Sequence, residues 1–106
     1  MRKSHFRATD VYKLVSKIPK GRVSTYGVVA KALKAKGASR AVGQILKANP
    51  NPIVVPCHRV VKSDGSIGGY GGAAGSSKKI KLLRSEGVAI RDGRVVDLER
   101  IVLKKF

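Results

Sequence analysis

The chain has 106 residues and a formal net charge of +17, with 23 lysines and arginines against 6 acidic residues, which favours a polyanionic partner such as nucleic acid. Its single cysteine excludes an internal disulfide, and its two histidines lack the spacing of a zinc site, so we expect no metal and no cofactor. No apolar stretch approaches the roughly 18 residues of a membrane span, so we expect one soluble, cytoplasmic domain over residues 1–106 and no membrane partner.

Three short helices are predicted in the first half of the chain, each with a polar residue near its start that can cap it. The candidate caps are Thr9 or Asp10 for the first helix, Ser24 or Thr25 for the second, and Ser39 for the third. Apolar residues at helical spacing over residues 11–18 support the first helix. The second helix is expected to end at Gly37, and the third to cover residues 40–48.

The second and third helices, over about residues 24–48, are typical of a helix-turn-helix motif because a tight turn with Gly37 joins them. An ordinary helical hairpin has the same pattern, and the net charge of +17 favours the DNA-binding interpretation. The third helix mixes basic side chains with small ones, which would let its backbone come close to a duplex. The candidate DNA-binding residues are Ser39, Arg40, Ala41, Gly43 and Lys47.

The lone cysteine lies in a segment that the sequence marks as unusual. The four residues at positions 49–52, Asn-Pro-Asn-Pro, break the helical pattern, and the apolar residues 53–55 then read as a strand that leads to Cys57. A lone buried cysteine is usually a small packing residue. Here His58 and Arg59 follow directly, and cationic neighbours favour the reactive thiolate form. Cys57 is therefore a candidate nucleophile.

A glycine-rich loop follows, and it completes an active-site strand and loop over residues 49–75. Its glycine spacing matches neither common phosphate-binding motif, so we interpret it as the wall of a close-fitting pocket. A helix capped by a serine is predicted over residues 76–86. Residues 88–96 alternate around Asp92-Gly93, which predicts a β-hairpin that would act as a wing. Residues 98–106 fit either a strand or a short helix. The predicted fold is a mostly α single domain with small β elements, similar to a winged helix-turn-helix.

The segment from Asn49 to Val61, together with the glycine-rich loop after it, resembles the active-site segment of the O6-alkylguanine-DNA alkyltransferases, also called methylated-DNA–protein-cysteine methyltransferases. The resemblance runs over about residues 18–87 and implies the C-terminal DNA-binding and transfer domain alone, without the N-terminal domain that many members carry. It implies a monomeric repair protein that approaches double-stranded DNA from the minor groove with little sequence preference. Such a protein flips an O6-alkylguanine out of the duplex and transfers the alkyl group irreversibly to its own cysteine, in a single turnover.

The same resemblance assigns roles to individual residues. In the reaction, Cys57 is the nucleophile, His58 the base that acts through a water, Glu86 the carboxylate that orients His58, and Tyr26 the acid that donates to the guanine. Arg40 would enter the base stack in place of the flipped nucleotide. The substrate pocket would be formed by Val60, Tyr70, Gly71 and Gly72, and the structural links by Asn49 and Arg59. Many relatives carry serine at the position of Gly71, and residues 74–75 lengthen the loop, so the range of alkyl groups accepted stays open.

Two other functions compete with this interpretation. An alkyltransferase-like lesion sensor binds the damaged base without transfer, but such proteins usually replace the cysteine, so Cys57 argues against one. A winged-helix transcription or chromatin protein would have an inert Cys57 and would use Arg40 and the third helix to read bases in the major groove.

Overall fold

The computed structural model describes residues 6–35, 37–49, 55–67 and 75–106. In chain order the elements are α1 (Ala8–Val15), β1 (Ser24–Thr25), α2 (Tyr26–Ala32), α3 (Ser39–Lys47), the 3-10 turn η1 (Cys57–Arg59), β2 (Val60–Val61), α4 (Gly75–Ser85), β3 (Ile90–Arg91), β4 (Arg94–Val95) and α5 (Leu98–Ile101). The predicted fold class, mostly α with small β elements, is confirmed. No helix within the described ranges has the length and apolar character needed to cross a membrane.

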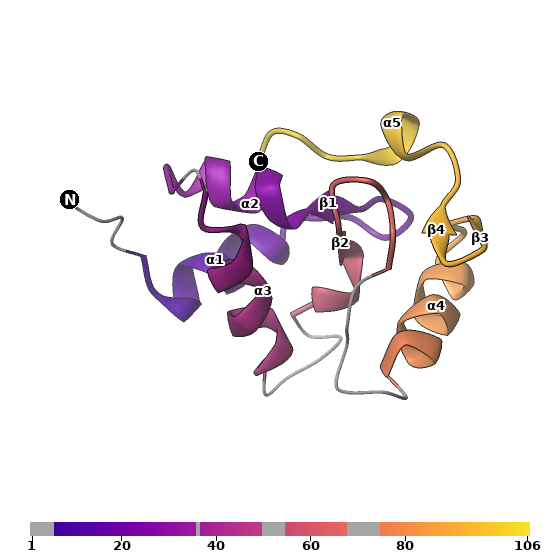
Figure 1. Cartoon of the computed structure of the whole chain (residues 1–106), viewed down its shortest axis with the longest axis horizontal. Helices are drawn as coiled ribbons and strands as arrows, with labels where there is room; N and C mark the ends of the chain where they lie inside the picture. Colours follow the sequence, from indigo (N-terminus) through magenta and orange to yellow (C-terminus); the bar gives the residue numbers. More distant parts are fainter. Residues whose placement is uncertain (1–5, 36, 50–54, 68–74) are drawn as a thin grey trace.

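Helices α1, α2 and α3 pack together at one end of the molecule, and α4 lies at the other end (Figure 1). Helix α1 begins two or three residues earlier than predicted, because Arg7 is its capping residue. Asp10 supports this start from inside the helix, where its Oδ2 accepts a hydrogen bond of 2.7 Å from the backbone N–H of Arg7. The prediction that Thr9 or Asp10 is the cap was therefore wrong in position, although Asp10 does stabilise the helix end.

The predicted helix-turn-helix is present as α2, the following turn and α3. Thr25 caps α2, since its Oγ1 accepts the backbone N–H of Val28 at 3.1 Å. The turn includes Gly37 with a φ of +91°, a conformation that glycine adopts at little cost. Ser39 is the first residue of α3 rather than its cap, because Ala38 occupies the capping position.

The short parallel pair of β1 and β2 lies between two hydrophobic clusters. Ser24 pairs with Val60 and Thr25 with Val61. Because successive side chains of a strand point to opposite faces, Val60 and Val61 serve different clusters. The first cluster contains Val11, Val15, Ile18, Val29, Ala30, Val42, Leu46, Cys57 and Val60. The second contains Val23, Val61, Ile67, Leu83, Val88, Ile90 and Val95. Strand β2 is therefore held by both clusters, through Val60 on one face and Val61 on the other.

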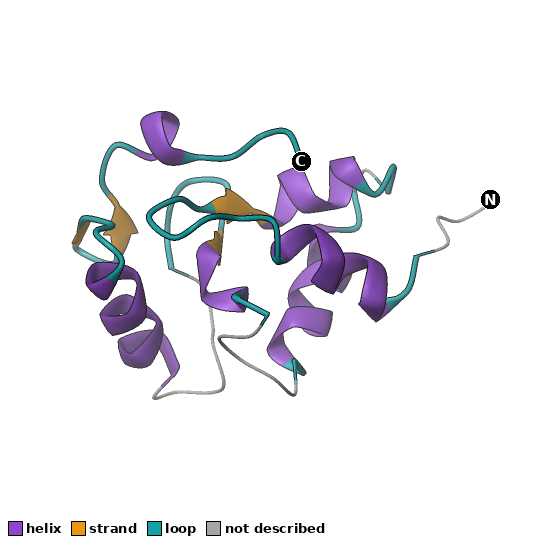
Figure 2. Cartoon of the chain, turned by 180° about the vertical axis from the view of Figure 1, so that it is seen from behind, coloured by secondary structure: helices purple, strands orange, loops and turns teal. Residues whose placement is uncertain are grey.

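The hairpin predicted around Asp92-Gly93 is present, with β3 antiparallel to β4. Both turn residues have positive φ, +52° and +74°, as a two-residue hairpin loop with the strand twist requires. The hairpin lies beside α4, at the far end of the molecule from α3 (Figures 1 and 2). The hairpin extends the second cluster and does not flank α3, as the predicted wing would.

The C-terminal segment begins with the short helix α5 and continues without a regular strand, so of the two alternatives left open for residues 98–106 the short helix is present. After α5, Val102 forms a parallel bridge with Val23. Two further bonds come from the Arg22 guanidinium, which donates to the carbonyl oxygens of Ile101 and Val102 at 3.1 Å each. These contacts hold the last residues against the strand that precedes α2.

Candidate active site

Cys57, His58 and Arg59 form a 3-10 turn. The strand predicted over residues 53–55 lies mostly outside the described residues. The turn arises because the N–H of Cys57 bonds the carbonyl of Val55 at 2.7 Å and the N–H of Arg59 bonds that of Pro56 at 2.9 Å. Strand β2 begins only after it. The turn leaves Cys57 5% exposed and His58 1% exposed. Because the backbone turns here, the two neighbouring side chains are not forced to opposite faces as they would be in a strand.

His58 and Arg59 both contact Glu86, which follows the last residue of α4. The Nε2 atom of His58 lies 3.0 Å from Oε2 of Glu86. The Arg59 guanidinium donates to both carboxylate oxygens, at 2.9 and 2.7 Å, and also to the carbonyl oxygen of Ile18 at 2.8 Å. The contact expected between His58 and Glu86 is therefore present, and Arg59 links the reactive turn to α4 and to the segment after α1.

The charge states in this cluster follow from burial and these bonds. Burial opposes ionisation of Glu86, but the hydrogen bonds from Arg59 and His58 outweigh it and lower the pKa of that carboxyl. Burial also lowers the pKa of His58, and the bond to Glu86 offsets this only in part. A neutral His58 must then carry its proton on Nε2 to donate to the carboxylate, which leaves Nδ1 as an acceptor. Within the described part of the chain, this buried Nδ1 has no hydrogen-bond partner.

Tyr26, the first residue of α2, lies between α3 and α4. A Cβ atom at Gly43 would be 3.8 Å from two of its ring carbons, so α3 passes close to the ring. From α4, the Nζ atom of Lys79 lies 3.4 Å from the phenol oxygen and donates to the carbonyl oxygen of Val60 at 2.6 Å. Burial, and then the charge of Cys57, raises the pKa of Tyr26, so its phenol stays protonated at neutral pH.

Lys79 is a site residue that sequence reasoning missed. It is fully buried, although apolar periodicity alone places charged side chains of a helix on its solvent face. A signal was available, because residues four apart share a helix face and Lys79 precedes the buried Leu83 by four. A lysine on the buried face of a helix needs a reason, since burial penalises its charge.

The candidate DNA-binding residues of α3 are mostly on the surface: Ser39, Arg40, Ala41 and Lys47 are exposed, and Gly43 is half-buried. A hollow of about 480 Å³ connects the start of this helix with Tyr26, and it is lined by Tyr26, Gly27, Ser39, Arg40, Gly43, Lys62 and Ser63. Lys62 and Ser63, which follow β2, were not predicted as site residues. The exposed start of α3 therefore shares this hollow with Tyr26, and no residue of the turn Cys57–Arg59 belongs to its lining.

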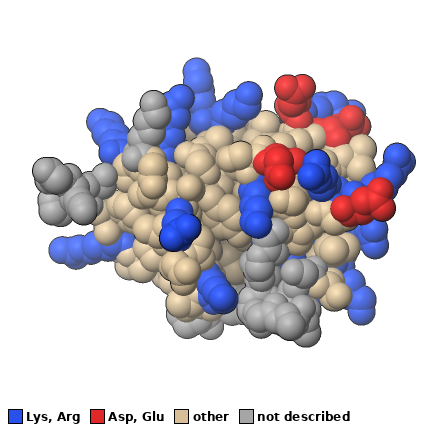
Figure 3. Space-filling view, in the orientation of Figure 1, with Lys and Arg blue, Asp and Glu red and all other residues tan. Residues whose placement is uncertain are grey.

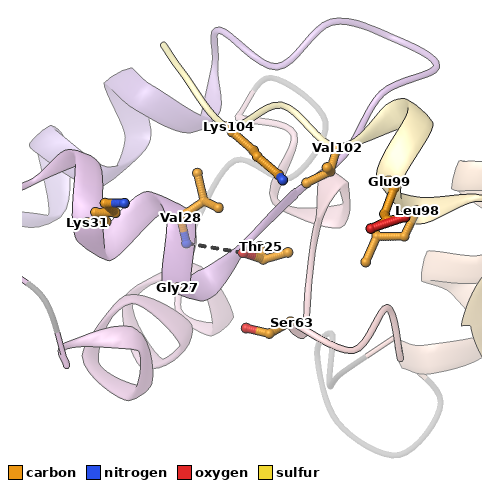
Figure 4. A pocket seen from close by; sticks show the side chains of 9 residues that line it. All are labelled: Thr25, Gly27, Val28, Lys31, Ser63, Leu98, Glu99, Val102 and Lys104. Carbon is orange, nitrogen blue, oxygen red and sulfur yellow. Dashed lines mark hydrogen bonds between the residues drawn. The ribbon is translucent and has the colours of Figure 1, made fainter.

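A second cavity, of about 390 Å³, adjoins this hollow and shares Gly27 and Ser63 with it. Figure 4 shows its walls, which come from the end of β1, from α2, from the loop after β2 and from the C-terminal segment: Thr25, Gly27, Val28, Lys31, Ser63, Leu98, Glu99, Val102 and Lys104. Its lining contains neither cysteine nor histidine, and it lies outside the cluster around Cys57.

The remaining predicted site residues differ in how they are placed. Asn49 donates from Nδ2 to the carbonyl oxygen of Val55 at 3.0 Å, so the expected link between the end of α3 and the reactive segment is present. The side chain of Val60 is fully buried in the first cluster. Its contact with the candidate site is made by its carbonyl oxygen, which accepts a hydrogen bond from Lys79. Tyr70, Gly71 and Gly72 lie outside the described residues. No group of three metal-binding side chains occurs among the residues that are described.

Comparison with known proteins gives one family. Residues 7–88 match the family described as 6-O-methylguanine DNA methyltransferase, DNA binding domain. A bifunctional methyltransferase/endonuclease of Thermoplasma volcanium is 41% identical over 96 residues, which make up 91% of this chain and 30% of that protein. A methylated-DNA–protein-cysteine methyltransferase of Methanothermobacter thermautotrophicus is 46% identical over 80 residues, 76% of this chain and 43% of that protein. The chain thus spans less than half the length of these two relatives.

Two solved structures of DNA complexes are also similar to this chain. The S. pombe Atl1 structure, in complex with damaged DNA containing O6-carboxymethylguanine, superposes with a TM-score of 0.82 at 37% identity and covers 98% of this chain and 99% of its own. Mycobacterium tuberculosis OGT in complex with DNA has a TM-score of 0.71 at 42% identity and covers 76% of this chain and 48% of its own. With the family match extending over most of the sequence, the chain belongs to the 6-O-methylguanine DNA methyltransferase family, as a DNA-binding domain of that family.

Proposed function

We propose that this chain repairs DNA directly, by moving an alkyl group from O6 of a guanine to the sulfur of Cys57 in a single irreversible turnover. The observation that carries the proposal is the surroundings of this buried thiol. His58 follows Cys57 directly, its Nε2 faces Glu86, and its buried Nδ1 has no partner within the described residues. A base oriented by a carboxylate, next to a nucleophile, is the general arrangement that activates a weak nucleophile.

The proposed reaction starts when Cys57 loses its proton, through a water, to Nδ1 of His58. The resulting thiolate attacks the alkyl carbon in line, so that the S–C bond forms while the bond from that carbon to O6 breaks. The electron pair of the broken bond goes to the guanine, which takes a proton from the Tyr26 phenol. These steps need only the side chains of the protein, a water and the damaged base.

The proposed substrate is a guanine flipped out of double-stranded DNA from the minor groove, with Arg40 in the gap that it leaves. Flipping costs a few kcal/mol and is easiest for a damaged base. The charge distribution supports a DNA surface around α2 and α3, because no acidic residue occurs in the sequence between Asp10 and Asp64. In Figure 3 the acidic side chains gather near the hairpin and α5, while basic ones spread over the visible face. Little sequence preference is expected, since phosphate contacts carry no sequence information.

A lesion sensor without transfer is the second candidate, and one observation favours it. The likeness to S. pombe Atl1 extends over 98% of this chain and 99% of that protein, whereas OGT of M. tuberculosis is matched over 48% of its length. Lesion recognition and transfer are separable, because the first depends on the DNA surface and the pocket and the second also needs the thiol. The presence of Cys57 makes transfer the leading proposal.

Intact-protein mass after mixing with an oligonucleotide that contains O6-methylguanine separates the two candidates. Transfer predicts a stoichiometric gain of one CH2, confined to the wild type, absent in Cys57→Ala and mapped to Cys57 by peptide analysis. Selective binding to the lesion without a mass gain would support the sensor. Neither mass gain nor selectivity would refute both and leave a basic DNA-binding domain.

A further inference from the structure

Lys79 is a buried cation without a carboxylate partner. Its side chain is 0% exposed. The six acidic residues of the chain all lie in the described part, and none of the ion pairs found there involves Lys79. Buried charges in proteins are normally paired, because the loss of hydration is otherwise uncompensated. Glu86, which contacts the reactive turn, is already held by Arg59 and His58.

The ammonium of Lys79 is fixed between the parts of the active site. It donates to the carbonyl oxygen of Val60 at 2.6 Å, directly after the reactive turn, and lies 3.4 Å from the phenol oxygen of Tyr26. It also lies 5.7 Å from the centre of the Tyr26 ring, within the range of a cation–π contact. α4, which carries Lys79, packs against the turn that holds Cys57.

The titratable and charged groups that face Lys79 come from three other elements. They are Tyr26 from α2, Cys57 and His58 from the turn, and Lys62 from the loop after β2. Burial lowers the pKa of Lys79 to about 8; the negative charge of Cys57 acts in the opposite direction, and Lys62 lowers it further. Lys79 therefore remains mostly charged at neutral pH. The group among these that can balance the charge of Lys79 is the sulfur of Cys57 once it has lost its proton.

We propose that Lys79 is a positioning residue whose ammonium balances the negative charge of the reaction, first on the Cys57 sulfur and then on the Tyr26 oxygen. When Cys57 becomes an uncharged thioether and the guanine takes the phenol proton, the charge moves to the Tyr26 oxygen. The ammonium at 3.4 Å can return a proton to this oxygen and become a neutral amine, a form that a buried site tolerates. Solvent later restores the proton. The role of Lys79 at the Tyr26 oxygen, the second half of the proposal, rests on the transfer proposed above. Its role at the Cys57 sulfur, the first half, does not require DNA.

The first half is tested with iodoacetamide, a small uncharged reagent that alkylates thiolates, over a range of pH values. Lys79→Met keeps a side chain of similar length and removes the charge, and Lys79→Arg keeps the charge. We expect Lys79→Met to lower the alkylation rate of Cys57 at pH 7 about tenfold and to shift its pH profile upward by about one unit. Lys79→Arg should restore the profile toward that of the wild type.

Lys78→Met and Lys81→Met are matched controls, because both lysines lie on α4 but are exposed. They should leave the profile unchanged. A Lys79→Met variant that is less stable to heat yet has the wild-type pH profile would show that Lys79 only packs, and would overturn the proposal. An unchanged profile with unchanged stability would overturn it as well. Because the reagent replaces DNA, a failure of alkyl transfer from DNA does not affect this result.

Discussion

Glu86 and His58 lie 28 positions apart in the sequence, yet Oε2 of the carboxylate is 3.0 Å from Nε2 of the imidazole. The same oxygen also accepts a hydrogen bond of 2.7 Å from Arg59, so one carboxylate orients the candidate base and anchors the turn that presents the thiol. The proposed chemistry therefore depends on contacts that also stabilise the fold. Changes to this cluster must be measured for stability and for transfer separately.

The substitution Glu86→Gln should reduce both stability and transfer. A neutral side-chain amide in place of the carboxylate cannot accept the two charge-assisted bonds from Arg59 or fix the tautomer of His58. Because the Arg59–Glu86 pair is only slightly exposed, its loss should cost about 2–3 kcal/mol in the free energy of unfolding. The transfer rate should fall at least about tenfold, as for a misoriented base. Urea unfolding and single-turnover transfer measure the two effects, and Ser85→Ala, at the exposed neighbouring residue, is the control.

The lowered pKa of Glu86 has a consequence for the dependence of stability on pH. The folded protein holds this carboxylate ionised more strongly than the unfolded chain does, so the stabilisation is complete above the unfolded pKa, near 4.5. It is lost as the pH falls through the lower, folded pKa. Unfolding free energies of the wild type should therefore drop below about pH 4.5 more steeply than those of Glu86→Gln. Parallel curves for the two proteins would contradict the assignment.

His58 should set the acid limit of transfer. Burial lowers its pKa below the usual 6.5, so the neutral form that accepts a proton on Nδ1 persists to more acidic pH than for a free histidine. The transfer rate should hold through pH 6.5 and decline only below it. Removal of the base in His58→Gln should lower the rate about a hundredfold or more while lesion binding is retained. A rate of the wild-type order in His58→Gln would exclude the proposed relay.

Arg40 is expected to act only when there is a stack to fill. Arg40→Ala should slow transfer on duplex DNA by about tenfold or more, because the gap left by the flipped base stays empty and unstacking is uncompensated. On single-stranded DNA with the same lesion the rate should recover in large part. Lys47 is an exposed basic residue on the same helix, and Lys47→Ala should weaken binding to duplex and single-stranded DNA alike. Equal losses for Arg40→Ala on both substrates would mean that Arg40 binds phosphate and does not enter the stack.

Much of the fold could be predicted from local signals. Apolar spacing located α1, where Val11 and Val15 are both fully buried. The dipeptide Asp92-Gly93 located the hairpin, because few other pairs accept positive φ at both positions. The contacts of Asn49 and Glu86 followed from a family resemblance and not from any spacing in this chain.

What the sequence could not show depends on contacts between distant residues or on very short elements. The bridge between Val23 and Val102 fixes the position of the C-terminal segment, and no local sequence pattern encodes this contact. The 3-10 turn at Cys57 has too few residues for any periodicity, so no local pattern predicted it. Lys79 was missed because a hydrophobic pattern assigns charged residues to the surface, and this outweighed its spacing of four from Leu83. The packing of α4 against Tyr26 and the turn is what makes a buried lysine possible here.

Lys62 provides a test of the DNA surface that is independent of the chemistry. It is exposed and lines the same hollow as Arg40, at the entrance to Tyr26, which suits a contact with a phosphate near the flipped nucleotide. The affinity of the wild type for duplex DNA should fall steeply with salt, with a log–log slope of about −0.9 for each phosphate that is neutralised. Lys62→Gln should make this slope shallower by about 0.9, with equal weakening on DNA of any sequence. Lys20→Gln, exposed in the loop between α1 and β1, is the matched control for the loss of one positive charge. If both variants change the slope equally, Lys62 contributes only to the overall charge, and the DNA path across this hollow is wrong.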